Sequence, residues 1–131
     1  MLPSADNTAK GGVMAKCKLI KGKDRRFETL AGPPGAARVA RDVTTDMSKT
    51  LGCGLSEFEN IKMPWTVKYD EYFYCLEGTL RIRAEGTVYE MQPGDGLWLP
   101  KGTELVYEAD KKARLVFTIY PVNWRQIEGV A

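Results

Sequence analysis

The chain has 131 residues, with 19 lysines and arginines against 17 aspartates and glutamates, and 44% of its residues are hydrophobic. This length and composition predict one domain that buries a core without disulfide staples. The charge is nearly balanced and forms no basic run or acidic tail, so the sequence predicts neither a nucleic-acid partner nor a membrane-surface partner.

Cysteine usage and the absence of apolar runs indicate the compartment. Cys17, Cys53 and Cys75 are an odd set without Cys-x-x-Cys spacing, which is typical of a reduced chain. No apolar run approaches the roughly 20 residues of a membrane span. Residues 1–16 lack the apolar core of a signal peptide. We expect a cytoplasmic protein with a flexible tail over residues 1–16 and one domain over residues 17–131.

The chain contains no histidine. This absence removes the commonest metal ligand and the commonest general base at neutral pH. It also excludes Ser-His-Asp and Cys-His catalysis.

The first half of the chain predicts short strands separated by turns. Residues 17–20 predict a first strand that could pair with a partner subunit. The segment 31–37 contains two prolines and two glycines and predicts a loop. Residues 38–44 and 51–58 predict strands, with Gly52 and Gly54 marking a close backbone approach or a bulge. Residues 60–64 predict a turn.

The second half, from Pro64 onward, predicts successive antiparallel strands. Runs 79–84 and 87–91 alternate and meet at a glycine turn, Glu85-Gly86, and a Pro-Gly turn precedes residues 97–99. Residues 104–108 alternate strictly, and residues 113–120 form a β-branched and aromatic strand that ends at Pro121. A short helical turn is expected over 123–127. The fold class is therefore all-β, a small antiparallel barrel.

Two motifs in this half resemble those of the cupin superfamily, a double-stranded β-helix barrel of the jelly-roll type. Glu71 and Gly78 stand at the interval of the first cupin motif, and Gly94, Pro100 and Gly102 match the second. The metal-binding histidines of these motifs are replaced. In the first motif their positions carry Trp65 and Val67, or Pro64 and Thr66 with the longer spacing, and in the second Leu105. The resemblance thus keeps the scaffold residues and loses the ligands of a transition metal.

A narrower resemblance is to the cupin domain of the ethanolamine-utilisation protein Q (EutQ) family. It rests on Pro-Trp-Thr-x-x-Tyr-Asp-Glu at 64–71, Leu-Glu-Gly at 76–78, Pro-Lys-Gly at 100–102 and Tyr-Pro-Val-Asn-Trp at 120–124. The resemblance implies a cytosolic role in ethanolamine catabolism, with possible association with a bacterial microcompartment, and an acetate-kinase-like activity. It also implies a homodimer, which would cover the outward side of the aromatic run Tyr72-Phe73-Tyr74.

Glu71 is the first candidate site residue. In the cupin pattern this carboxylate points into the barrel, where it would act as an acid-base or ligand-binding group with a pKa raised by apolar surroundings. The alternative is a scaffold glutamate tied to a backbone amide or an arginine. Tyr69 is a candidate hydrogen-bond donor to an anionic ligand, and Asp70 should point the other way, into a turn.

The remaining candidates line the expected pocket. Strand alternation places Phe73 and Cys75 on the same side as Glu71. Trp65, Phe73, Cys75 and Tyr107 are the candidate ligand-binding residues, although Cys75 is also explained as a small buried apolar residue. Val67 and Leu105 are better explained as core. Two further features are more simply solvated surface than anion sites: Arg81 with Arg83, and Lys101.

Three functions stay open. The first is the acetate-kinase-like enzyme, with Glu71 as a Mg²⁺ or general-base carboxylate and Tyr69 as an orienting group. The second is a metal-free module that binds a small polar or anionic molecule, or an amine held by charge pairing and cation–π contact. The third is a dimerising scaffold without a ligand. A fourth function, that of an ordinary metal cupin, is disfavoured because iron, nickel or copper sites of the usual type cannot form without histidine, whereas an oxygen-rich site around Glu71 stays open for a hard cation. No cofactor is expected, and Mg²⁺ is expected only with phosphoryl transfer.

Overall fold

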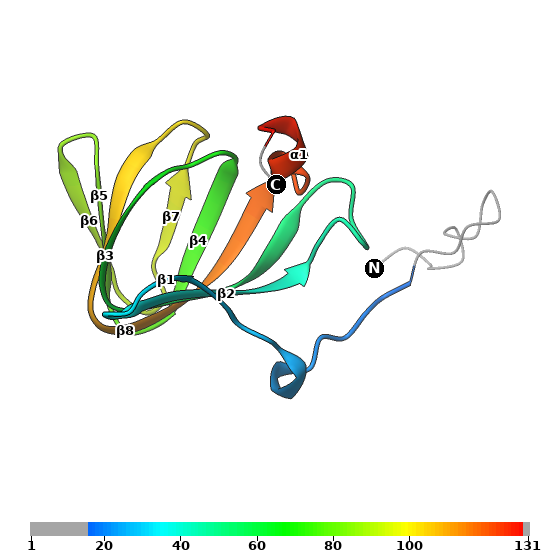
Figure 1. Cartoon of the computed structure of the whole chain (residues 1–131), viewed down its shortest axis with the longest axis horizontal. Helices are drawn as coiled ribbons and strands as arrows, with labels where there is room; N and C mark the ends of the chain where they lie inside the picture. Colours follow the sequence, from blue (N-terminus) through cyan, green and yellow to red (C-terminus); the bar gives the residue numbers. More distant parts are fainter. Residues whose placement is uncertain (1–15, 130–131) are drawn as a thin grey trace, which may run out of the picture.

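A computed structural model describes residues 16–129. These residues form eight strands, one 3₁₀ turn and one short helix (Figure 1), which confirms the all-β prediction. In chain order the elements are η2 (Gly22–Asp24), β1 (Glu28–Ala31), β2 (Ala36–Val43), β3 (Gly52–Thr66), β4 (Asp70–Glu77), β5 (Leu80–Ala84), β6 (Thr87–Met91), β7 (Gly96–Leu99), β8 (Glu104–Tyr120) and α1 (Trp124–Ile127).

The two longest strands, β3 and β8, hold the barrel together. They pair antiparallel from Gly52 opposite Ile119 to Thr66 opposite Glu104, so both strands run through both walls of the barrel. One wall adds β2 and β1 beyond β3, and β4 and β7 beyond β8. The other wall adds β5 and β6 beside the first half of β8. In Figure 1 the β5–β6 hairpin lies at the left, and β1 and β2 run along the lower edge of the barrel.

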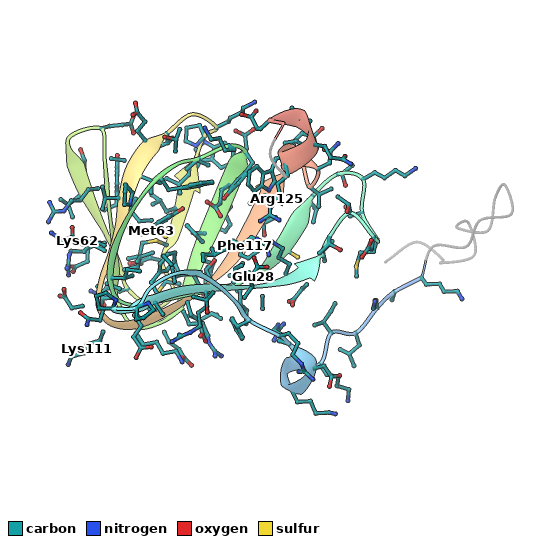
Figure 2. The ribbon with its side chains drawn as sticks, in the orientation of Figure 1. Glu28, Lys62, Met63, Lys111, Phe117 and Arg125 are labelled. Carbon is teal, nitrogen blue, oxygen red and sulfur yellow. The ribbon has the colours of Figure 1, made fainter. Side chains whose placement is uncertain are left out.

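Strand alternation fills the barrel as the sequence predicts. On β4 the inward side chains of Glu71, Phe73 and Cys75 are 3%, 2% and 0% exposed, whereas Tyr72 and Tyr74 point outward. Side chains of both walls meet in one core, and Figure 2 shows Met63 of β3 and Phe117 of β8 within it. Burial of these apolar side chains is the main favourable contribution to folding.

Two glycines mark backbone positions where a side chain does not fit. Gly54 faces β2, and a Cβ atom there would collide with the carbonyl oxygen of Ala40, which confirms the predicted close approach. Gly78 ends β4 with a φ of 73°, and a Cβ atom there would collide with the carbonyl oxygen of Lys112. The cupin-motif glycine is therefore required both by the left-handed backbone and by the packing of β8.

Three sequence predictions of local structure were wrong. Residues 60–64 do not form a turn: β3 continues through them, and Asn60, with a φ of 46°, absorbs one register shift as a bulge. Residues 104–108 and 113–120 belong to one strand, β8, because pairing with β3 continues across residues 109–112. Residues 17–20 form no strand within the described chain, where Leu19 is 77% exposed. The predicted tail, residues 1–16, lies almost entirely outside the described residues.

Charged side chains on the outer surface pair with one another. Glu108 is buried to 5% exposure against Arg81 and Arg83, with Arg83 Nε donating to Glu108 Oε2 over 2.6 Å. The hydrogen bond from Arg83, with help from Arg81, lowers the pKa of Glu108 to about 2. Glu57 is held in the same way by Arg114 on the other wall. These arginines therefore belong to outer ion-pair networks and do not reach the barrel interior.

One outer face is aromatic and exposed. Tyr72 pairs with Trp98 across β4 and β7, and Tyr74 lies beside them; their exposed fractions are 47%, 58% and 40%. Tyr120 at the end of β8 adds a fourth exposed ring, at 56%. A second copy of the chain would cover this surface, and the homodimer stays a prediction. Within residues 16–129, no helix has the length and hydropathy of a membrane-spanning helix.

Candidate functional site

Glu71 lies on the inner face of the barrel, and one of its carboxyl oxygens is buried without a hydrogen-bond partner. Its neighbours across the sheet are Leu99 and Ile119, both apolar and buried. Oε1 of Glu71 is buried and has no hydrogen-bond partner. Burial raises the pKa of Glu71 to about 8, since an ionised carboxylate is costly in an apolar setting. At pH 7 the side chain is therefore predominantly the neutral acid, which can donate a hydrogen bond.

The structural role of a carboxylate tied to a backbone amide is filled by Asp70, next to Glu71 in the sequence. Asp70 points outward, as expected, and its Oδ1 accepts a hydrogen bond of 2.9 Å from the backbone N–H of Lys101. This bond ties the start of β4 to the turn before β8. Glu71 receives no such bond at Oε1. A buried polar group without a partner costs about 1–3 kcal/mol, so this carboxyl group is not explained by the stability of the fold.

Two tyrosines lie near Glu71. Tyr107, on β8, is 3% exposed and is held by Phe58 and Phe73, with ring centroids 4.7 Å and 6.0 Å away. Burial, with the nearby Glu71 as a second cause, raises the pKa of both Tyr69 and Tyr107. Both hydroxyl groups therefore keep their protons at neutral pH and are available as donors.

Three aromatic rings pack against one another next to Glu71, those of Trp65, Tyr69 and Trp124. Trp124 of α1 packs on Tyr69 with a centroid distance of 5.0 Å and on Trp65 with a distance of 6.2 Å. Arg125, also of α1, lies over the Trp124 ring with its guanidinium carbon 5.3 Å from the ring centroid (labelled in Figure 2). The positive charges of Arg41 and Arg125 act on Tyr69 and oppose the rise of its pKa.

The structure brings most of the predicted site residues together. Tyr69 and Tyr107 lie near Glu71, Phe73 packs on Tyr107, and Trp65 is partly buried against the same core. Cys75 lies apart, four residues further along β4 or roughly 13 Å at about 3.3 Å per residue. Its thiol faces the carbonyl oxygens of Glu77 and Gly78 at 3.6 Å and 3.5 Å. These contacts fit the packing role.

Trp124 is a residue of this aromatic cluster that the sequence did not predict. The ending Tyr-Pro-Val-Asn-Trp was used as a family signature, and the helical turn over 123–127 was predicted. Neither observation placed the indole at the barrel opening. That placement depends on the chain turning back after β8, where the backbone N–H of Val122 donates to Thr50 over 2.8 Å. Such a long-range contact leaves no periodic signal in the sequence.

The histidine positions of the cupin motifs are filled by apolar side chains. Val67 and Leu105 are 0% and 4% exposed and belong to the core, and Trp65 is half-buried. Within residues 16–129, no group of three His, Cys, Asp or Glu side chains could hold a metal ion. One carboxyl group with a raised pKa is a poor donor set even for a hard cation. The residues of this site therefore do not fit a metal.

A groove of about 840 Å³ lies close to the site without containing Glu71. It runs past the turn of the β5–β6 hairpin, and Trp65, Leu105 and Arg83 are among its lining residues. Its lining carries two basic residues, Arg83 and Lys68, and two acidic ones, Glu85 and Glu104. The chemistry described above is concentrated inside the barrel, so we assign the candidate site to Glu71 and not to this groove.

The comparison with known proteins agrees with this architecture. Residues 3–126 match the family described as "Ethanolamine utilisation protein EutQ". The chain belongs to the EutQ family. It is 31% identical over 121 residues to "Acetate kinase EutQ" of Escherichia coli strain K12, a match that covers 92% of this chain and 50% of the relative. The chain thus spans about half the length of the curated relatives it matches.

Solved structures support the cupin assignment of this EutQ-family chain. The Clostridium difficile EutQ protein superposes with a TM-score of 0.67 at 30% identity, covering 72% of this chain and 69% of that chain. The polyketide cyclase RemF from Streptomyces resistomycificus superposes with a TM-score of 0.70 at 15% identity, covering 86% and 94%. At that identity the second likeness shows the fold alone. The double-stranded β-helix prediction is confirmed.

The raised pKa of Glu71 predicts a specific pH dependence of stability. The folded state holds this proton up to about pH 8, whereas the unfolded chain releases it near the ordinary value of 4.5. The stabilisation of the folded state by the protonated Glu71 is therefore fully present below pH 4.5 and is lost as the pH rises through 8. Between these two pH values the free energy of unfolding falls by about 1.4 kcal/mol per pH unit.

The variant Glu71→Gln removes this titration and should flatten the loss of stability between pH 5 and pH 8. Urea unfolding at several pH values measures the effect. Glu77→Gln, an exposed position on the same strand, is the control and should leave the slope unchanged. Equal slopes for the parent and Glu71→Gln would contradict a protonated Glu71.

Proposed function

We propose that this EutQ-family domain serves ethanolamine utilisation by binding a small carboxylate or acyl compound, such as acetate or acetyl phosphate, inside its barrel. The observation that carries the proposal is the buried Glu71 Oε1 without a partner, in a site whose other polar groups are tyrosine hydroxyls. The name of the Escherichia coli relative, an acetate kinase, points to the same class of ligand.

The protonation states favour an anionic ligand over a cationic one. At neutral pH the acid of Glu71 and the hydroxyls of Tyr69 and Tyr107 are all donors, and none carries a negative charge. A carboxylate or carbonyl oxygen accepts from such groups, and these bonds are strong because the surroundings are apolar. Arg41 and Arg125 add positive potential on the side of Tyr69.

Acetate binding should therefore weaken as the pH rises. Acetate stays ionised throughout, while Glu71 changes from a donor to a like charge around pH 8. We expect dissociation constants in the millimolar range at pH 6.5 and about tenfold weaker binding at pH 9. NMR shift perturbation at both pH values measures this. Glu71→Gln should bind with little pH dependence, because its amide remains a donor.

Binding that strengthens with rising pH would identify a different class of ligand. Ethanolamine carries a positive charge and would bind better once Glu71 is ionised, through charge pairing and contact with the aromatic rings. Stronger binding of ethanolamine at pH 9 than at pH 6.5, with no acetate binding, would overturn the carboxylate proposal. Binding of neither compound at either pH would leave the barrel as a dimerising scaffold.

Phosphoryl transfer is the second candidate, and the names of the relatives favour it. The described residues supply the acyl side of such a site but no cluster of carboxylates that could hold Mg²⁺. The assay is formation of acetyl phosphate from acetate and ATP with Mg²⁺. If this domain is catalytic, Glu71→Gln should lose at least tenfold in turnover while Glu77→Gln keeps it. Full turnover in Glu71→Gln would exclude a role for this carboxyl group.

A further inference from the structure

The helix α1 is only loosely part of the barrel. It has four residues, none of them buried, and it follows the end of β8 through residues 121–123. Val122 is fixed by its hydrogen bond to Thr50, so the segment beyond it can move about that point. Short segments with few buried contacts are those that open locally at low free-energy cost.

Two contacts hold α1 against the barrel. The indole of Trp124 packs on Trp65 and Tyr69, as described above. At the other end of the helix, Lys101 Nζ lies 3.2 Å from Glu128 Oε2, with side chains 54% and 25% exposed. An ion pair this exposed contributes about 0–1 kcal/mol. The indole is therefore the main attachment.

The same indole packs on Tyr69, one of the residues of the candidate site. Tyr69 directly precedes Asp70 and Glu71 along the chain, and its ring is the closer of the two aromatic partners of Trp124. Glu71 is only 3% exposed, so a ligand reaches it only after something moves. Val67, between Trp65 and Tyr69 in sequence, is fully buried on this side of the interior. Its own backbone is fixed by hydrogen bonds with Gly102 and Thr103.

We propose that α1 is a lid, that Trp124 is the residue that admits or excludes ligands at the Glu71 site, and that the Lys101–Glu128 ion pair is its latch. The proposal deepens the proposed function and rests on it for the identity of the ligand. Opening moves the indole away from Trp65 and Tyr69 while β8 and β4 stay paired. With the lid closed, the indole excludes water and limits the site to small ligands, which agrees with a compound the size of acetate.

Thiol labelling tests the lid without any ligand. The parent carries Cys17→Ser and Cys53→Ser to remove the two accessible thiols, and Val67→Cys to place a thiol of similar volume behind the lid. The native Cys75, deeper on the inner face and 0% exposed, reports unfolding of the whole barrel. Iodoacetamide labelling of each thiol is followed by mass spectrometry.

Lid opening predicts different rates at the two thiols. In the parent, the thiol at position 67 should react faster than Cys75. Its rate should rise at least tenfold in Trp124→Ala and up to about fivefold in Glu128→Gln, relative to the same thiol in the parent. Trp98→Ala, which removes an exposed indole from the outer face, should change neither rate. Glu128→Gln keeps the indole and serves as the decisive variant if Trp124→Ala weakens the fold.

Two results would overturn the lid. Equal labelling of position 67 and Cys75 in every variant would mean that the interior opens only by unfolding. Fast labelling of position 67 at the same rate in the parent, Trp124→Ala and Glu128→Gln would mean that ligands enter by another route, such as the groove beside Trp65. Because the labelling uses no ligand, a failure of acetate to bind would refute the proposed function without deciding whether α1 opens.

Discussion

The antiparallel ladder between β3 and β8 is the constraint on which the rest of the structure depends. Its register runs the length of both strands and passes from one wall of the barrel to the other. β4 and β5 each attach to β8, so the ladder also fixes which side chains of β4 face inward. A slip of one residue in that pairing would exchange the inner and outer faces of β4 and place Tyr72 inside and Glu71 outside.

The position of Glu71 is thus fixed by backbone pairing, while its chemistry is set by what surrounds it. The cupin frame normally surrounds this carboxylate with histidines, and here the same positions carry apolar side chains. The result is a neutral acid with one oxygen unpaired. Evolution of a barrel for stability alone would favour an apolar residue at this position, since an unpaired buried polar group is destabilising. A bound ligand that accepts a hydrogen bond from the protonated Glu71 would remove that cost. Ligand binding would therefore also stabilise the fold.

The sequence predicted what local patterns and motif spacing can encode. Alternation gave the inward set Glu71, Phe73 and Cys75, and the motif glycine Gly78 lies at a left-handed turn, as the structure requires. The continuity of β3 through Asn60 was not predictable, because polar and proline residues mark turns unless a partner strand supplies pairing. The position of Trp124 was missed for a related reason: its contacts with Trp65 and Tyr69 join segments about 55 to 60 residues apart in the sequence.

The protonation state of Glu71 is the central claim, and ¹³C NMR of its side-chain carboxyl carbon measures that state directly. The Glu71 resonance is assigned by its absence from the spectrum of Glu71→Gln, and its shift is followed from pH 4 to pH 10. We expect a single titration near pH 8 and a protonated carboxyl group at pH 7. A titration near the ordinary glutamate value of about 4.3 would mean that the group is ionised in the folded barrel, and would contradict both the anion site and its pH dependence.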